Sequence, residues 1–206
     1  FGKLNSMLGE LLEEMLKKLD QQMSDFDDLH AVDLFNAYYG GFDALKLFVG
    51  RAEGITGFSE VLIFRAIYHF LGGDFERVLV NENGIKWGDK YKFVKDSLTL
   101  AKSPTLRCDG RKYSPDIVVY RNNTPSTVIE IKIYPVQGHQ TIKDVVERLS
   151  CLHGCFPNLK GCLIIYDCGG DARKLLDEYD RSLSWFFPLV LKDNPVLFKT
   201  FLQELL

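Results

Sequence analysis

Two apolar runs separated by a short polar segment decide the fold of this chain. The runs read Ser114-Pro115-Asp116-Ile117-Val118-Val119-Tyr120 and Thr127-Val128-Ile129-Glu130-Ile131-Lys132-Ile133-Tyr134. Both are rich in β-branched residues, which is typical of β-strands. Between them lies Asn122-Asn123-Thr124-Pro125, a group of turn-forming residues. The pattern predicts strands near 115–121 and 127–134 that can pair as a hairpin.

The second run carries two charges that are unusual in a central strand. Side chains alternate between the two faces of a strand, so Val128, Glu130 and Lys132 share one face. Glu130 and Lys132 would then lie about 6–7 Å apart. Burial of either charge without a partner costs several kcal/mol. Asp116 opens the neighbouring strand and would converge on the same place if the hairpin forms.

Two carboxylates beside a lysine form an arrangement suited to a hard divalent cation, because Mg²⁺ prefers oxygen ligands and retained waters. Such a metal lowers the pKa of a bound water and neutralises charge on a phosphate, and Lys132 would orient that water or stabilise the charge. The alternative is a structural ion pair in an unrelated α/β protein. It predicts that Glu130 and Lys132 are exposed and that Asp116 points elsewhere.

The rest of the chain supplies the flanking elements. Further strands are expected near 76–82, 92–100, 162–166 and 185–191. Helices are expected over 58–71, from a cap at Thr141 to about His153, over 171–182, and after a cap at Asn194 with Pro195 in the first turn. Turns are expected at Asn83-Gly84 and Asp109-Gly110. This order predicts an α/β fold with a mixed sheet flanked by helices.

The first 56 residues predict a helical N-terminal extension. Residues 4–23 place Leu and Met at three- and four-residue steps, which is the pattern of an amphipathic helix. A second helix is expected over 28–39, ended by Gly40-Gly41, and a third over 43–50. The apolar stripe of 4–23 needs a cover, either its own chain or a second copy in a homodimer.

Composition and charge narrow the function classes. The chain has 206 residues, of which 46% are hydrophobic. No apolar run approaches the roughly 18 residues of a membrane span, and we expect a cytoplasmic protein without a membrane partner. The formal net charge is −3, yet residues 77–112 hold nine basic residues against four acidic ones. This segment could face a polyanion such as a nucleic acid, or it could be an ordinary solvated surface.

The chain has five cysteines, an odd number. We expect reduced thiols, since a chain of this size folds without disulfides. Cys151 and Cys155 lie at helical i,i+4 spacing near His153, but the sequence offers no second pair of ligands of the kind that zinc sites use. Small buried hydrophobes are therefore the preferred interpretation of the cysteines.

Pro115-Asp116, followed after thirteen residues by Glu130-Ile131-Lys132, resembles the signature of the PD-(D/E)XK nuclease superfamily. The order of helix, three strands, helix and strand over 57–168 also resembles the core of that family. The resemblance implies a restriction-endonuclease-like domain over 57–206, in which 169–206 is a C-terminal helical addition. It implies that Asp116 and Glu130 hold Mg²⁺ or Mn²⁺ and that Lys132 acts on the attacking water.

The resemblance also suggests supporting residues. Some family members add an acid from the first core helix, and here Glu60 lies in line with Phe64 and Ile67 on the apolar side of that helix. Related nucleases often contact substrate through the region that holds Lys143 and Arg148, but ordinary surface polarity is the preferred interpretation of these two residues. Lys112 ends the basic segment. The leading hypothesis is a Mg²⁺-dependent nuclease acting on DNA rather than RNA. The alternative is a non-catalytic nuclease-like subunit that binds nucleic acid or regulates a partner.

Overall fold

The computed structural model describes residue 21 and residues 26–49, 56–79, 91–134 and 138–206. The chain forms two compact units. The first comprises residues 1–72 and 192–202, and the second comprises residues 73–191 and 203–206. The helix expected at 4–23 and the turn expected at Asn83-Gly84 lie outside the described residues, and the predicted division at residue 56 stays a prediction.

A mixed sheet forms the centre of the second unit. Its seven described strands follow the order β1-β2-β3-β6-β7-β8-β9, in which all neighbours are antiparallel except β7 with β8 and β8 with β9, which are parallel. The strand bounds are β1 Glu76–Leu79, β2 Tyr91–Lys95, β3 Leu98–Lys102, β6 Ile117–Arg121, β7 Thr124–Lys132, β8 Lys160–Ile165 and β9 Phe186–Val190. The predicted α/β class with a mixed sheet is confirmed.

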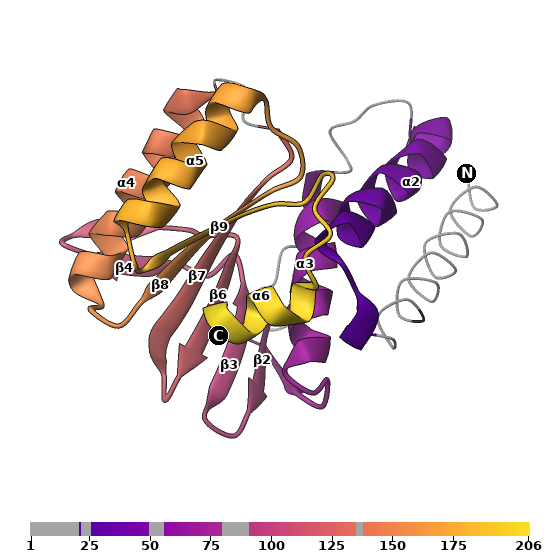
Figure 1. Ribbon diagram of the computed structural model, residues 1–206. Coiled ribbons are helices and arrows are strands. Elements are labelled where there is room, and N and C mark those ends of the chain that lie inside the picture. The colour runs from indigo at the N-terminus through magenta and orange to yellow at the C-terminus, as the bar shows by residue number, and fades with distance from the viewer. Residues whose placement is uncertain (1–20, 22–25, 50–55, 80–90, 135–137) are drawn as a thin grey trace. The chain divides into compact units, whose positions relative to one another are not determined.

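Helices α4 (His139–Cys155) and α5 (Gly170–Ser182) lie side by side on one face of this sheet (Figure 1). Apolar side chains of both helices are buried against the strands. The core cluster includes Val118, Val128, Leu163, Ile165, Val190, Ile142, Val145, Val146, Leu149, Leu152, Ala172 and Leu176. Val128 lies on the helix-covered face, so the alternation along β7 places Glu130 and Lys132 on that face too.

The predicted hairpin of β6 and β7 is confirmed. Asn122 and Asn123 connect the strands with positive φ angles of 51° and 61°, which suits a tight hairpin turn. Strand β7 begins at Thr124, earlier than expected, and a register shift between Val119 and Tyr120 accommodates the extra length. Pro125 is buried within the strand.

The single strand expected at 92–100 is wrong, because this segment folds as two strands. β2 and β3 are joined by Asp96 and Ser97, with Asp96 at φ 51°. The expected turn at Asp109-Gly110 is present, but it joins two short strands that the sequence did not predict, β4 (Leu106–Cys108) and β5 (Arg111–Tyr113).

The expectation of reduced thiols is also wrong for two cysteines. Cys108 on β4 forms a disulfide with Cys155 at the end of α4, with their Cα atoms 5.9 Å apart. The physical reason is that the β4-β5 hairpin packs on α4 and brings together residues 47 positions apart in the sequence. Cys151, Cys162 and Cys168 are free.

The first unit is helical, with η1 (Phe26–Asp28), α2 (Ala31–Val49) and α3 (Thr56–Phe70). α3 agrees with the helix expected at 58–71. The break expected at Gly40-Gly41 is wrong, because α2 runs through both glycines. The roughly 1 kcal/mol that each glycine costs a helix does not end it.

The last part of the chain also differs from expectation at one boundary. Asn194 Oδ1 accepts a hydrogen bond of 3.0 Å from the backbone N–H of Val196, so it stabilises a turn. The helix α6 (Phe198–Leu205) starts later than predicted. Within the described residues, none of the helices is long and apolar enough to cross a membrane.

A substitution of Gly161 on β8 can test how closely α4 and Trp185 pack on this strand. A Cβ atom at this position would lie 3.0 Å from Trp185 Cζ3 and 3.3 Å from Leu149 Cβ. The Trp185 ring is held by stacking on His153 at 4.9 Å, so it has little room to move. We expect Gly161→Ala to lower the free energy of unfolding by about 1–3 kcal/mol in denaturant titrations.

The matched control is Gly154→Ala on α4, where an added Cβ meets nothing within 4 Å. This change should be neutral or stabilising by up to about 1 kcal/mol, because alanine favours helices. Equal stability of the Gly161→Ala variant and the wild type would contradict the described packing.

Candidate active site

The site begins where the ladder between β6 and β7 ends. The last pair of this ladder is Ile117 with Ile129. Ile131 lies two residues further along β7, so its N–H and C=O point to the same side as those of Ile129 but find no partner residue on β6. The N–H of Ile131 donates a hydrogen bond of 2.7 Å to Asp116 Oδ2. The side chain of Asp116 thus takes the place of a strand partner and is fixed against β7.

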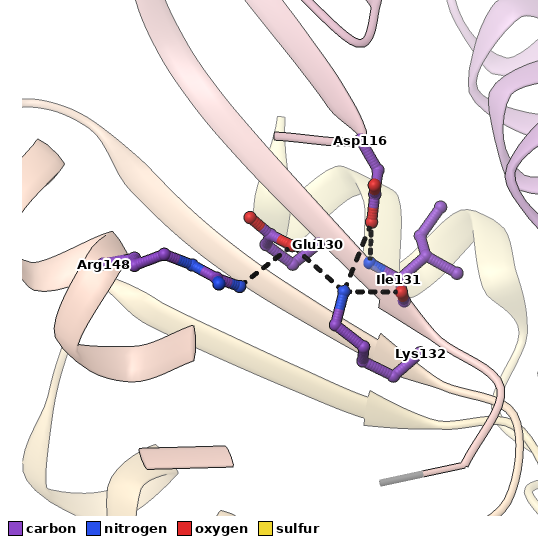
Figure 2. A network of polar contacts seen from close by, with 5 residues as sticks. All are labelled: Asp116, Glu130, Ile131, Lys132 and Arg148. Carbon is purple, nitrogen blue, oxygen red and sulfur yellow. Dashed lines mark hydrogen bonds and ion pairs between the residues drawn. The ribbon is translucent and has the colours of Figure 1, made fainter. Parts of the chain in front are cut away.

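The ammonium group of Lys132 occupies the centre of the site (Figure 2). Its Nζ atom lies 3.2 Å from Glu130 Oε2 and 3.7 Å from Asp116 Oδ2. It also donates a hydrogen bond of 3.0 Å to the Ile131 carbonyl oxygen. Three oxygens, two from β7 and one from the residue that precedes β6, therefore converge on one cation, and the sequence predicted this convergence for Asp116, Glu130 and Lys132.

Helix α4 adds a second cation to the site. Arg148 Nη2 lies 3.4 Å from Glu130 Oε2, on the side away from Lys132 in Figure 2. Its neighbour Leu149 is fully buried against the sheet, so Arg148 projects from the border between the packed and exposed sides of the helix. The sequence marked Arg148 as a nucleic-acid contact but not as a partner of Glu130.

The two carboxylates are largely withdrawn from solvent. The side-chain exposures are 10% for Glu130, 20% for Asp116 and 29% for Lys132. The alternative predicted an exposed ion pair with Asp116 pointing elsewhere, whereas Glu130 is buried, Lys132 is half-buried and Asp116 lies beside Lys132. Burial is the largest cause of the raised pKa of Glu130, and the negative charge of Asp116 raises it further. The positive charges of Lys132 and Arg148 lower the pKa but do not cancel the effect of burial.

A pocket of about 340 Å³ opens onto these groups. It lies within the second unit, and its wall is formed by the end of the β4-β5 hairpin, the start of β6, strand β7 and helix α4. The lining residues are Lys112, Tyr113, Ser114, Asp116, Glu130, Lys132, Arg148 and Leu152. Tyr113 and Ser114 were missed from the sequence, where the only signal was that they directly precede Pro115-Asp116.

The remaining predicted residues have different outcomes. Lys112 lines the pocket, whereas Lys143 is exposed on α4 and is not among the lining residues. Glu60 lies on α3, on the same helical side as the buried Phe64 and Ile67, and is itself partly buried. α3 belongs to the first unit, so a metal-binding role of Glu60 stays a prediction.

The donor set defines what the site can do. Asp116, Glu130 and the Ile131 carbonyl present oxygen atoms only, which are the ligands of hard divalent cations such as Mg²⁺. A scan against protein-family models finds no match to the chain, and a search of curated proteins finds none either.

Titration of Glu130 should be visible in the stability of the metal-free protein. Its folded-state pKa is raised above the ordinary value of 4.5. Between these two pKa values the folded state keeps a proton that the unfolded state has released. The free energy of unfolding should therefore fall as pH rises through this window. Glu130→Gln should abolish this part of the pH dependence, measured by denaturant unfolding from pH 4 to 8, with about 1 unit between points.

The control for this measurement is Glu147→Gln, because Glu147 is exposed on α4. Its pH profile should keep the shape of the wild-type profile. A Glu130→Gln profile parallel to that of the wild type would show that Glu130 titrates alike in the folded and unfolded states.

Proposed function

We propose that the chain is a divalent-metal-dependent nuclease that hydrolyses phosphodiester bonds in DNA. The observation that carries this proposal is the convergence of Asp116, Glu130 and the Ile131 carbonyl on the Lys132 ammonium group, in a pocket at the edge of the β6–β7 ladder. The order of α3, the antiparallel β3, β6 and β7, then α4 and the parallel β8 supports a restriction-endonuclease-like fold.

The three oxygens fit a divalent cation. Lys132 already draws them around one positive charge at 3.0–3.7 Å, and two carboxylates held this closely repel each other unless a cation lies between them. Asp116, Glu130 and the Ile131 carbonyl would hold Mg²⁺ or Mn²⁺. The metal would activate a bound water and neutralise charge on the phosphate.

Each protein group then has a separate task. The Ile131 N–H fixes the carboxylate of Asp116, and Arg148 orients that of Glu130 through its ion pair. When a metal takes over these three oxygens, the N–H groups of Lys132 become available to direct the attacking water and to stabilise the negative charge that develops on the phosphate. Lys112 stands at the pocket wall, where it can bind a phosphate of the substrate strand.

One observation favours the alternative of a non-catalytic subunit. Glu130 forms ion pairs with two cations of the protein, Lys132 and Arg148. These ion pairs would also stabilise the carboxylate in a site that never binds a metal. Metal binding separates the two functions. Titration calorimetry with Mg²⁺ and Mn²⁺ should detect one high-affinity class of sites in the nuclease and none in the non-catalytic subunit.

DNA cleavage tests the proposal directly. Single-stranded, duplex and branched DNA are incubated with Mg²⁺, with Mn²⁺ and with EDTA. We expect cleavage with either metal and none with EDTA. Asp116→Asn and Lys132→Ala should each lower the rate about 100-fold or more, because they remove a metal ligand and a stabiliser of developing charge.

Asp144→Asn is the matched control for these variants. Asp144 is exposed on α4, outside the pocket lining, where it accepts a hydrogen bond from Gln140. Its activity should stay within a factor of two of the wild type. Metal-dependent cleavage that persists unchanged in Asp116→Asn and Lys132→Ala would refute the assignment.

Variants of two lysines can distinguish a phosphate contact at the pocket wall from a general effect of surface charge on DNA binding. Lys112 lines the pocket and Lys143 does not. If a phosphate binds at the pocket wall, Lys112→Ala should weaken DNA binding and reduce the slope of log affinity against log salt by about 0.7–0.9. Lys143→Ala should leave the slope nearly unchanged. Fluorescence anisotropy with catalytically inactive Asp116→Asn protein measures both, and equal slopes would contradict this role of Lys112.

The remaining expectations belong to the same proposal. The role of Glu60 as a further acidic ligand stays a prediction from the sequence, and a Glu60→Gln variant that binds Mg²⁺ as the wild type does would exclude it. A homodimer and a cytoplasmic location stay predictions from the sequence.

A further inference from the structure

A second group of ligating side chains lies beside the pocket, where the β4-β5 hairpin packs on the end of α4. The free thiol of Cys151 lies 3.9 Å from Cys108 Sγ, and Cys108 Sγ lies 3.9 Å from Asp109 Oδ2. One ligand atom of each of these three residues lies within 4.8 Å of the others. Cys155, the disulfide partner of Cys108, brings a third sulfur to the group.

The pair of Cys108 and Cys151 matches the sulfur spacing of a structural zinc site. Zinc binds thiolate sulfur at about 2.3 Å in tetrahedral geometry, which places two bound sulfurs about 3.8 Å apart. The separation of 3.9 Å between Cys108 and Cys151 agrees with this value. Cys151 and Cys155 lie one helical turn apart on α4, a spacing that lets two side chains of a helix share one metal.

We propose that the reduced chain binds one Zn²⁺ ion through Cys108, Cys151, Cys155 and Asp109. His153 is the other candidate for the fourth ligand, but its Nδ1 donates to the Leu159 carbonyl at 2.8 Å and its ring stacks on Trp185. Asp109 is exposed at the hairpin turn and directly follows Cys108, so its carboxylate can rotate toward the sulfurs.

Zinc binding requires prior reduction of the disulfide, because both sulfurs of a disulfide lack the charge of a thiolate. A dithiol donor supplies two electrons and two protons. It becomes oxidised to its own disulfide and leaves Cys108 and Cys155 as thiols. The three thiols then release their protons as they bind the metal. The zinc ion would replace the disulfide as the connection between the hairpin and α4.

Two features of the surroundings support a bound thiolate. Tyr113 donates a hydrogen bond of 3.0 Å from its hydroxyl to Cys151 Sγ, and such outer contacts orient metal ligands. Three thiolates and one carboxylate leave a zinc ion with excess negative charge. Arg111 is the cross-strand partner of Cys108 in the hairpin, so its positive charge lies beside the sulfurs and can offset that excess.

The zinc site differs in chemistry from the carboxylate site at Asp116. Sulfur ligands select zinc over the hard Mg²⁺ ion. Tyr113 and Leu152 line the pocket and come from the hairpin and from α4, so the zinc ion would hold two of its walls together. The proposal stands on the sulfur geometry and does not depend on nuclease activity.

Cobalt substitution tests the proposal on the full chain. The protein is stripped of metal, reduced with a phosphine without oxygen and titrated with Co²⁺. We expect one equivalent of Co²⁺ with the intense visible and near-ultraviolet absorption of tetrahedral thiolate coordination, and its displacement by Zn²⁺. Oxygen-ligated Co²⁺ at the Asp116 site lacks the thiolate absorption, so the two sites give different spectra. The oxidised protein should give no thiolate signal.

Variants identify the ligands. Cys151→Ser should weaken binding roughly 100-fold or more while leaving the Cys108–Cys155 pair intact, and Asp109→Asn should weaken it about tenfold. Asn tolerates the positive φ of position 109, so this second variant keeps the turn. Cys168→Ser, a free cysteine outside the group, should bind as the wild type does. A reduced wild type without the thiolate signal, or unchanged binding in Cys151→Ser, would overturn the proposal.

Discussion

The site depends on one constraint, the position at which strand β6 starts. Because the β6–β7 ladder ends at Ile117 and Ile129, the backbone of Ile131 must find other partners, and unpaired buried backbone groups are costly. Asp116 binds its N–H and Lys132 binds its C=O. The end of the ladder thereby fixes the side chains of Asp116 and Lys132, and it places both charged groups next to Glu130.

The resulting cluster balances opposing energies. Removal of Glu130 from water favours its neutral form, and the neighbouring carboxylate of Asp116 does the same, while Lys132 and Arg148 favour ionisation. The raised pKa shows that burial prevails. A group of this kind is stabilised by nearby positive charge, which Lys132 and Arg148 supply through their ion pairs with Glu130.

The sequence was informative where a pattern was long or chemically unusual. Charged Glu130 and Lys132 in an otherwise apolar run predicted the polar face of β7, and the asparagines at 122 and 123 predicted its hairpin. Short elements were missed, since β4 and β5 have three residues each and contain Arg and Lys. The disulfide was missed with them, because Cys108 reaches Cys155 only through that hairpin. Arg148 could be placed near the site only by the packing angle of α4, which periodicity does not determine.

The mixed direction of the strands has a consequence for the order in which the domain can assemble. Strands β2 with β3 and β6 with β7 pair with sequence neighbours through tight turns, whereas β8 and β9 join in parallel only after the crossover helices α4 and α5 are in place. Local contacts form faster than distant ones. The hairpin that joins Asp116 and Glu130 can thus form before α4 has packed on the sheet, and until α4 brings Arg148 to Glu130, Lys132 alone shields the repulsion of the two carboxylates.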